Sequence, residues 1–249
     1  MVKKQDTIYA LSTPPGKSAI AVVRVSGSNS LELVGKISSV LPATPNKSFL
    51  NKILKSNGDV IDQTITTYFK APKSFTGEDM VEISFHGSNA VINTFLDSFK
   101  KLKNARPAEP GEFTRRSFEN NKLDLTQVEA IADLVNSETE LQRKQAYNQL
   151  EGSFSKKTIE IYEKIKNILA NTEAIIDFAD EDLPKNLITS IKEQTRNICI
   201  EIDEILKNSN MGRKIRSGFI VGIIGKPNSG KSSFINNISN QDIAIVTDI

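Results

Sequence analysis

The stretch Gly218–Asn240, GFIVGIIGKPNSGKSSFINNISN, decides which fold begins in this part of the chain. It joins a run of β-branched residues to a segment with helical spacing through the pattern GxxxxGKS, from Gly225 to Ser232. The glycines at 225 and 230 let the backbone turn so that successive N–H groups point at one phosphate. The spacing therefore predicts the first strand, the phosphate-binding loop and the first helix of an α/β P-loop domain.

Each residue type of this loop suits a nucleoside triphosphate. The Lys231 ammonium can contact the β- and γ-phosphates, and the Ser232 hydroxyl can ligate Mg²⁺. Asn228 is either an ordinary turn former or, through its side-chain carbonyl, a ligand of a monovalent cation beside the phosphates. The predicted phosphate contacts are Asn228, Ser229, Gly230, Lys231, Ser232 and Ser233.

The chain holds only the opening of such a domain. It continues from the loop to Ile249, whereas a mononucleotide-binding domain needs roughly 150 residues. No DxxG follows that could sense the γ-phosphate, and no NKxD follows that could select guanine. The loop therefore predicts a triphosphate site without identifying the base, and we expect this length of chain not to hydrolyse nucleotide by itself.

Composition sets further limits. Among 249 residues, 32 Lys and Arg nearly balance 30 Asp and Glu, so overall charge gives no argument for nucleic-acid binding. The one cysteine, Cys199, excludes an internal disulfide, and its place in an apolar helical stripe predicts a core residue rather than a nucleophile. No segment has the apolar length of a signal peptide or a membrane span, which predicts a cytoplasmic protein without membrane contact.

Two regions precede the loop. Residues 1–118 are typical of an α+β domain, with strands at Ser18–Val25 and Asp79–Phe85 and a helix at Ser88–Lys101. A hairpin is predicted at Asn57-Gly58. Residues 119–213 contain long helices with apolar seams, which predict an all-α bundle of two to four helices, and residues 214–249 begin the P-loop domain. One apolar seam consists of Ile161, Ile165, Ile168, Leu169, Thr172, Ile175 and Ile176, and a second of Ile188, Ile191, Thr195, Ile198, Ile202 and Ile205. A third starts with Leu125, Val128, Ala132 and Val135.

Several motifs occur in a diagnostic order. They are DTIYALSTPPGKSAIAVVRVSG, SFTGEDMVEISFHGS, PGEFTRRSFENNKLDLTQVEAIADLVNSET, AIIDFADED and GKPNSGKSSFINNISNQDIAIVTDI. Together they make the chain closely resemble the tRNA-modification GTPases of the MnmE (TrmE) family. The resemblance covers essentially all of the chain and implies an N-terminal domain similar in fold to folate-dependent aminomethyltransferases. Family members are longer, so the chain is expected to be an N-terminal part that ends inside the first switch.

The resemblance also implies an activity. The family hydrolyses GTP with Mg²⁺ and K⁺ and, with its flavoprotein partner MnmG in a heterotetramer, modifies C5 of the wobble uridine of certain tRNAs. The group added is aminomethyl or carboxymethylaminomethyl, and its carbon comes from a tetrahydrofolate such as the 5-formyl or methylene form. The N-terminal domain binds this folate and forms a homodimer. The alternative is a folate-binding dimerisation module without nucleotide chemistry. A ribosome-assembly GTPase would share the phosphate loop but bind no folate.

The resemblance also implies roles for individual residues of this chain. Arg24, Glu82 and Lys122 match the folate-contacting positions of the family. Without the resemblance they would be a paired strand arginine, an exposed strand glutamate and a solvated lysine at a helix start. Asn228 matches a potassium ligand, and Thr247 and Ile249 match positions whose carbonyls complete that site. Catalytic residues are expected beyond Ile249. The only histidine, His86, is interpreted as a turn or packing residue, with a catalytic base as the alternative.

Overall fold

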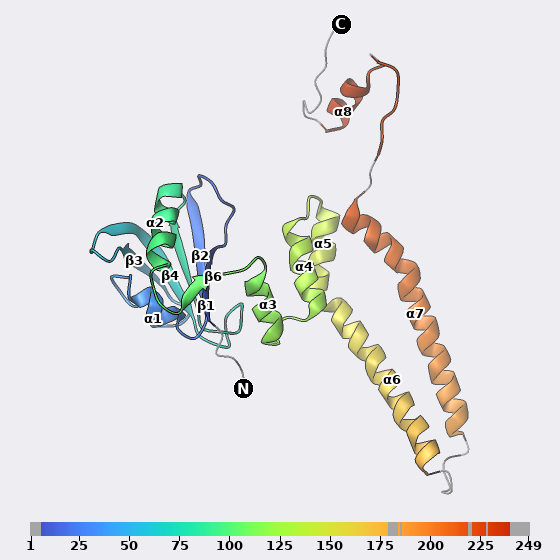
Figure 1. The fold of residues 1–249 in the computed structure, drawn as a ribbon. Helices are drawn as coiled ribbons and strands as arrows, with labels where there is room; N and C mark the ends of the chain where they lie inside the picture. The colour runs from blue at the N-terminus through green and yellow to red at the C-terminus, as the bar shows by residue number, and fades with distance from the viewer. Residues whose placement is uncertain (1–5, 179–183, 185, 219–220, 228, 240–249) are drawn as a thin grey trace. The chain divides into compact units, whose positions relative to one another are not determined.

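The structure is a computed structural model that describes residues 6–178, 184, 186–218, 221–227 and 229–239 (Figure 1). Its contacts divide the chain into two compact units. One unit contains Met1–Ser137 and Ala146–Glu160, and the other contains Glu138–Gln145 and Ile161–Ile249. Each unit is described by itself.

A six-stranded sheet forms the centre of the first unit. Its strand order is β3-β4-β5-β2-β1-β6, and neighbours are antiparallel except β1 and β6. Two helices, α1 (Ser30–Gly35) and α2 (Asn89–Phe99), contribute buried side chains to its core. The strands are β1 (Thr7–Leu11), β2 (Ile20–Ser26), β3 (Ser48–Leu54), β4 (Val60–Phe69), β5 (Met80–His86) and β6 (Ala105–Pro107).

The core lies on one face of this sheet because alternate residues of each strand point to it. Val81, Ile83 and Phe85 of β5 are buried, as are Phe95 and Phe99 of α2. The Phe85 and Phe95 rings lie 4.8 Å apart between centroids, so strand and helix meet through aromatic contacts. Alternate burial along the strands therefore gives the sheet a one-sided core.

The local sequence predictions for this unit are confirmed. The strands expected at Ser18–Val25 and Asp79–Phe85 are β2 and β5, and the Asn57-Gly58 turn joins β3 to β4. The helix expected at Ser88–Lys101 is α2, and the Ser88 hydroxyl caps it by accepting the Val91 amide at 3.1 Å.

Helices follow the sheet, as the sequence predicts. In the first unit, α3 (Glu112–Glu119) leads to α4 (Leu125–Val135), which begins with a capping box between Asp124 and Gln127. Gln127 Nε2 also donates to the Leu150 carbonyl at 2.8 Å and so joins α4 to the end of α5. The remaining helices are α5 (Glu140–Leu150), α6 (Ser153–Asp177), α7 (Leu187–Ser217) and α8 (Lys231–Ser239).

The predicted apolar seams of α6 and α7 are only partly covered. Ile198 is buried, but Leu169, Ile176 and Ile188 are exposed among the described residues. The helical region is therefore established, whereas its closed bundle stays a prediction. Cys199 is exposed, so its assignment to the core was wrong. Adjacent helical positions differ by about 100° around the axis, which places Cys199 off the stripe that buries Ile198.

The strand predicted before the phosphate loop is a second correction. The predicted strand covers residues 218–225, of which Gly218 and residues 221–225 are described; these form no strand, and Val221 and Ile224 are exposed. A β-strand needs a neighbouring strand for its N–H and C=O groups, and none pairs with it among the described residues. The helix predicted after the loop is present as α8. No helix in the described part of the chain combines the length and apolarity that crossing a membrane requires.

Candidate functional site

A cavity of about 640 Å³ opens beside the first two strands of the sheet. Its wall comes from β1 and β2, from Phe75, from the loop 108–111, from α3 and α4, and from Leu150. Most of these side chains are apolar, and the charged ones are Arg24 and Glu109. A space of this size with an apolar wall and few polar groups is typical of a site for an organic ligand.

Arg24 and Glu82 lie side by side because β2 and β5 pair them in register. Arg24 Nε donates to Glu82 Oε1 at 2.7 Å, and the guanidinium lies 5.5 Å from the centre of the Phe75 ring. Both side chains are about one-third exposed or less. The contacts hold Arg24 by its Nε edge, which leaves its Nη groups to donate to a ligand in the cavity.

Lys122, the third predicted folate contact, lies elsewhere. Its Nζ donates to the Pro72 carbonyl at 3.0 Å, and Lys122 is not part of the cavity wall. Its alkyl chain packs against Gly77, where an added Cβ would lie 3.1 Å from Lys122 Cγ. The structure thus brings Arg24 and Glu82 together and places Lys122 outside the cavity wall, and the folate assignment of all three stays a prediction.

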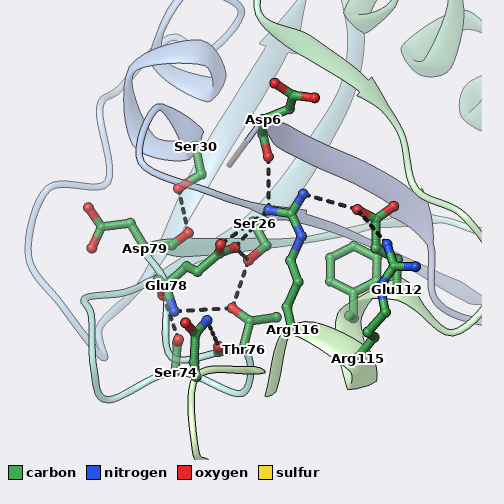
Figure 2. Close-up of polar contacts among 12 residues, drawn as sticks. Asp6, Ser26, Ser30, Ser74, Thr76, Glu78, Asp79, Glu112, Arg115 and Arg116 are labelled. Carbon is green, nitrogen blue, oxygen red and sulfur yellow. Dashed lines mark hydrogen bonds and ion pairs between the residues drawn. The ribbon is translucent and has the colours of Figure 1, made fainter. Parts of the chain in front are cut away.

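Sequence analysis missed a buried charge cluster next to the cavity (Figure 2). Arg116 of α3, with 4% of its side chain exposed, donates to Glu78, to Glu112 and to the Asp6 carbonyl. Arg106 of β6 donates to both oxygens of Glu112, at 2.8 and 2.7 Å. These bonds attach α3 to the sheet. In the sequence Glu112 and Arg116 belong to the charged segment PGEFTRRSFEN. A charged segment of this kind is as typical of a solvent-exposed helix as of a buried charge cluster.

Glu112 is the most buried member of this cluster, with 1% of its side chain exposed. The hydrogen bonds from Arg106 lower the pKa of Glu112 to about 2, although burial alone would raise it. Its carboxylate also accepts the Glu109 amide at 2.8 Å, and the Glu112 amide donates to the Glu109 carbonyl at 3.0 Å. The loop that lines the cavity is therefore tied to a buried, ionised carboxylate.

The phosphate loop is described apart from Asn228. Lys231 Nζ donates to the carbonyls of Gly225, at 3.1 Å, and Lys226, at 2.6 Å, so the lysine lies across its own loop. Gly230 has φ of 86°, which suits glycine. Ser232 and Ser233 lie in the first turn of α8, and Ser229 lies in the loop before it. The predicted potassium ligands Asn228, Thr247 and Ile249 lie outside the described residues.

His86, at the end of β5, pairs with Asp62. Its Nδ1 lies 2.8 Å from Asp62 Oδ1, and its amide donates to Asp62 Oδ2 at 2.8 Å. The ring is exposed, so His86 is not a core packing residue. Among the described residues, no three His, Cys, Asp or Glu side chains gather closely enough to hold a metal ion.

Comparison with known proteins identifies the family. A family model described as GTP-binding protein TrmE N-terminus matches residues 7–122, and a second, described as MnmE helical domain, matches residues 125–246. The chain belongs to the MnmE family of tRNA modification GTPases.

Individual MnmE proteins agree with this assignment. The chain is 45% identical to the tRNA modification GTPase MnmE of Pelagibacter ubique over 98% of its own length and 55% of that relative. The corresponding identities are 43% for Caulobacter vibrioides, of which it covers 54%, and 42% for Aquifex aeolicus, of which it covers 55%. The chain therefore spans about half the length of the curated MnmE relatives it matches.

Proposed function

We propose that the chain supplies the folate-binding part of a tRNA modification GTPase. In this proposal the complete protein acts with MnmG to add an aminomethyl or carboxymethylaminomethyl group at C5 of the wobble uridine of certain tRNAs. A tetrahydrofolate supplies the one-carbon unit, and GTP hydrolysis with Mg²⁺ and K⁺ drives the cycle. The relatives' name, tRNA modification GTPase, supports the tRNA and GTP parts.

The observation that carries the folate part is the apolar cavity with Arg24 in its wall. Folate has a flat heterocycle and a benzoyl group, which suit apolar walls, and carbonyl and carboxylate oxygens, which suit a guanidinium. Arg24 is held by Glu82 and Phe75 before any ligand arrives, so little side-chain freedom is lost on binding. Arg24 would thus bind and orient the folate.

A homodimer through the N-terminal domain is supported by the sheet face opposite the core. Leu50 of β3 pairs with Ile65 of β4, and both are exposed, as is Ile20 at the start of β2. With Ser84 and His86 they line a shallow second cavity of about 380 Å³. An exposed group of large apolar side chains is typical of a surface that another protein covers.

The nucleotide part is supported by the GxxxxGKS loop and helix α8. Ser232 would ligate Mg²⁺, and the K⁺ would be held by Asn228 with the carbonyls of Thr247 and Ile249. GTP hydrolysis by the complete protein, measured in KCl and in NaCl, tests this part. Asn228→Ala should abolish the stimulation by K⁺ over Na⁺, and equal stimulation of variant and wild type would contradict the potassium site.

The folate part is tested by calorimetric titration with 5-formyltetrahydrofolate. Arg24→Ala should weaken binding by about tenfold, because it removes a charge-assisted hydrogen-bond donor. Arg143→Ala is the matched control, since Arg143 Nε also donates to a glutamate at 2.7 Å but lies on α5, outside the cavity wall. No binding by wild type, or equal affinities in wild type and Arg24→Ala, would count against the folate site.

A further inference from the structure

We propose that Glu109 is a further ligand contact of the cavity, whose carboxylate binds the N–H donors of the ligand's heterocyclic ring. The proposal rests on the proposed function, because it names the part of a folate that this side of the cavity recognises. Arg24 would donate hydrogen bonds to the ligand's oxygen atoms, and Glu109 would accept hydrogen bonds from its N–H groups. The two charged residues of the wall would then bind different parts of the ligand.

The composition of the cavity wall is the first argument. Arg24 and Glu109 are its charged residues, and they come from different parts of the fold, β2 and the loop before α3. A carboxylate at the edge of an apolar cavity is costly unless a partner or water satisfies it. The side chain of Glu109 is 64% exposed, so in the free protein water can do so. A ligand with N–H groups can replace that water.

The backbone beneath Glu109 is the second argument. Its amide donates to the buried Glu112 carboxylate at 2.8 Å, and its carbonyl accepts the Glu112 amide at 3.0 Å. The preceding residue, Ala108, donates to the Tyr9 carbonyl of β1 at 2.9 Å. The nearly buried Glu112 carboxylate pairs with Arg116 at 3.0 Å, with Arg106 at 2.7 Å and with Arg115 at 3.8 Å, so its charge is neutralised beneath the loop. Such support keeps Glu109 in place, as precise ligand binding requires.

The chemistry of the ligand is the third argument. Two carboxylate oxygens can accept two parallel hydrogen bonds from neighbouring N–H groups. The pterin ring of a folate presents such a pair on its pyrimidine portion, an exocyclic amino group beside a ring N–H. The benzoyl-glutamate tail, by contrast, presents mainly oxygen acceptors. Glu109 is therefore suited to the ring rather than to the tail.

Arg115 provides the competing explanation. It lies 3.4 Å from Glu109, so Glu109 could serve only as the partner of an exposed arginine. Arg115 has a second such partner, Glu119, at 3.8 Å. Glu119 does not line the cavity, although it pairs with the same guanidinium. Glu119→Gln is therefore a matched control that removes a charge from Arg115 without touching the cavity.

The test compares Glu109→Gln and Glu119→Gln in the 249-residue chain. Each is titrated with 5-formyltetrahydrofolate and with p-aminobenzoyl-L-glutamate, which has the tail but no pterin ring. We expect Glu109→Gln to weaken binding of the complete folate by about tenfold and of the tail fragment by less than about twofold. Glu119→Gln should leave both affinities unchanged, and the thermal midpoints of the two variants should agree within about 2 °C.

The outcomes separate the two proposals. If wild type binds the folate but Glu109→Gln binds it equally well, the Glu109 contact is wrong while the folate site stands. Equal losses in Glu109→Gln and Glu119→Gln would assign the effect to Arg115 and also overturn the contact. An equal loss for folate and tail fragment would overturn recognition of the ring. If wild type binds neither probe, the proposed folate function itself is wrong, and the Glu109 contact falls with it.

Discussion

Arg106 holds the carboxylate of Glu112 at both oxygens, with 2.8 Å from Nη1 and 2.7 Å from Nη2. The pair joins β6, the last strand, to α3, the first helix after the sheet. Because Glu112 in turn holds the loop beside the cavity, this ion pair connects the stability of the fold to the shape of the candidate site.

The pair predicts a specific pH dependence. The pKa of Glu112 falls from 4.5 to about 2 on folding, so its contribution to stability is complete above about pH 4.5 and is lost as the pH falls toward 2. Glu112→Gln should be less stable than wild type at neutral pH, and the difference should shrink in acid. Urea unfolding from pH 7 to pH 3 measures this, and a difference that stays constant with pH would contradict it.

Arg116 should be far more important for stability than its neighbour Arg115. Arg116→Met removes the buried arginine that the carboxylates of Glu78 and Glu112 share, and should cost about 3–5 kcal/mol in the free energy of unfolding. Arg115→Met, at a side chain 54% exposed, should cost less than about 1 kcal/mol. Denaturant unfolding of both variants decides this, and similar losses would mean that the buried cluster contributes no more than a surface pair.

Alanine substitutions at Gly27 and Gly16 should distinguish the cost of a steric clash from the cost of backbone strain. Both glycines have similar positive φ angles, 135° and 132°. An added Cβ at Gly27 would lie 2.7 Å from Thr7 Cα, whereas at Gly16 nothing lies within 4 Å. Gly16→Ala should cost about 1–3 kcal/mol from strain alone. Gly27→Ala should cost about 1–3 kcal/mol more, because β1 must move. Thermal unfolding measures the stability of both variants. Equal losses of stability would show that β1 can move away from the added Cβ without a free-energy cost.

Phe75 should matter to ligand binding through Arg24. Phe75→Leu removes the ring that lies 5.5 Å from the guanidinium and should weaken 5-formyltetrahydrofolate binding by about threefold. Phe49→Leu is the control, because the Phe49 ring of β3 lies 5.7 Å from the Lys47 ammonium and does not line the cavity. Titration calorimetry compares them. An unchanged affinity in Phe75→Leu would show that Arg24 needs no aromatic support.

The sequence by itself determined the local elements and the family. The hairpin at Asn57-Gly58, the strand through Arg24 and the capped helix after Ser88 were all predictable. Each depends on turn chemistry, on alternation or on capping among residues close together in the chain. The motif order likewise predicted the MnmE family, which the family comparisons confirm. The P-loop pattern predicted helix α8 for the same local reason.

Only the tertiary structure decided the cavity and the buried charges. Arg116 contacts the Asp6 carbonyl 110 positions away, and Arg24 contacts Glu82 58 positions away. Whether a charge is solvated or buried depends on which distant segments pack against it, and no local pattern records that. The strand predicted before the phosphate loop was wrong for the same reason, since a strand exists only where a partner supplies its hydrogen bonds.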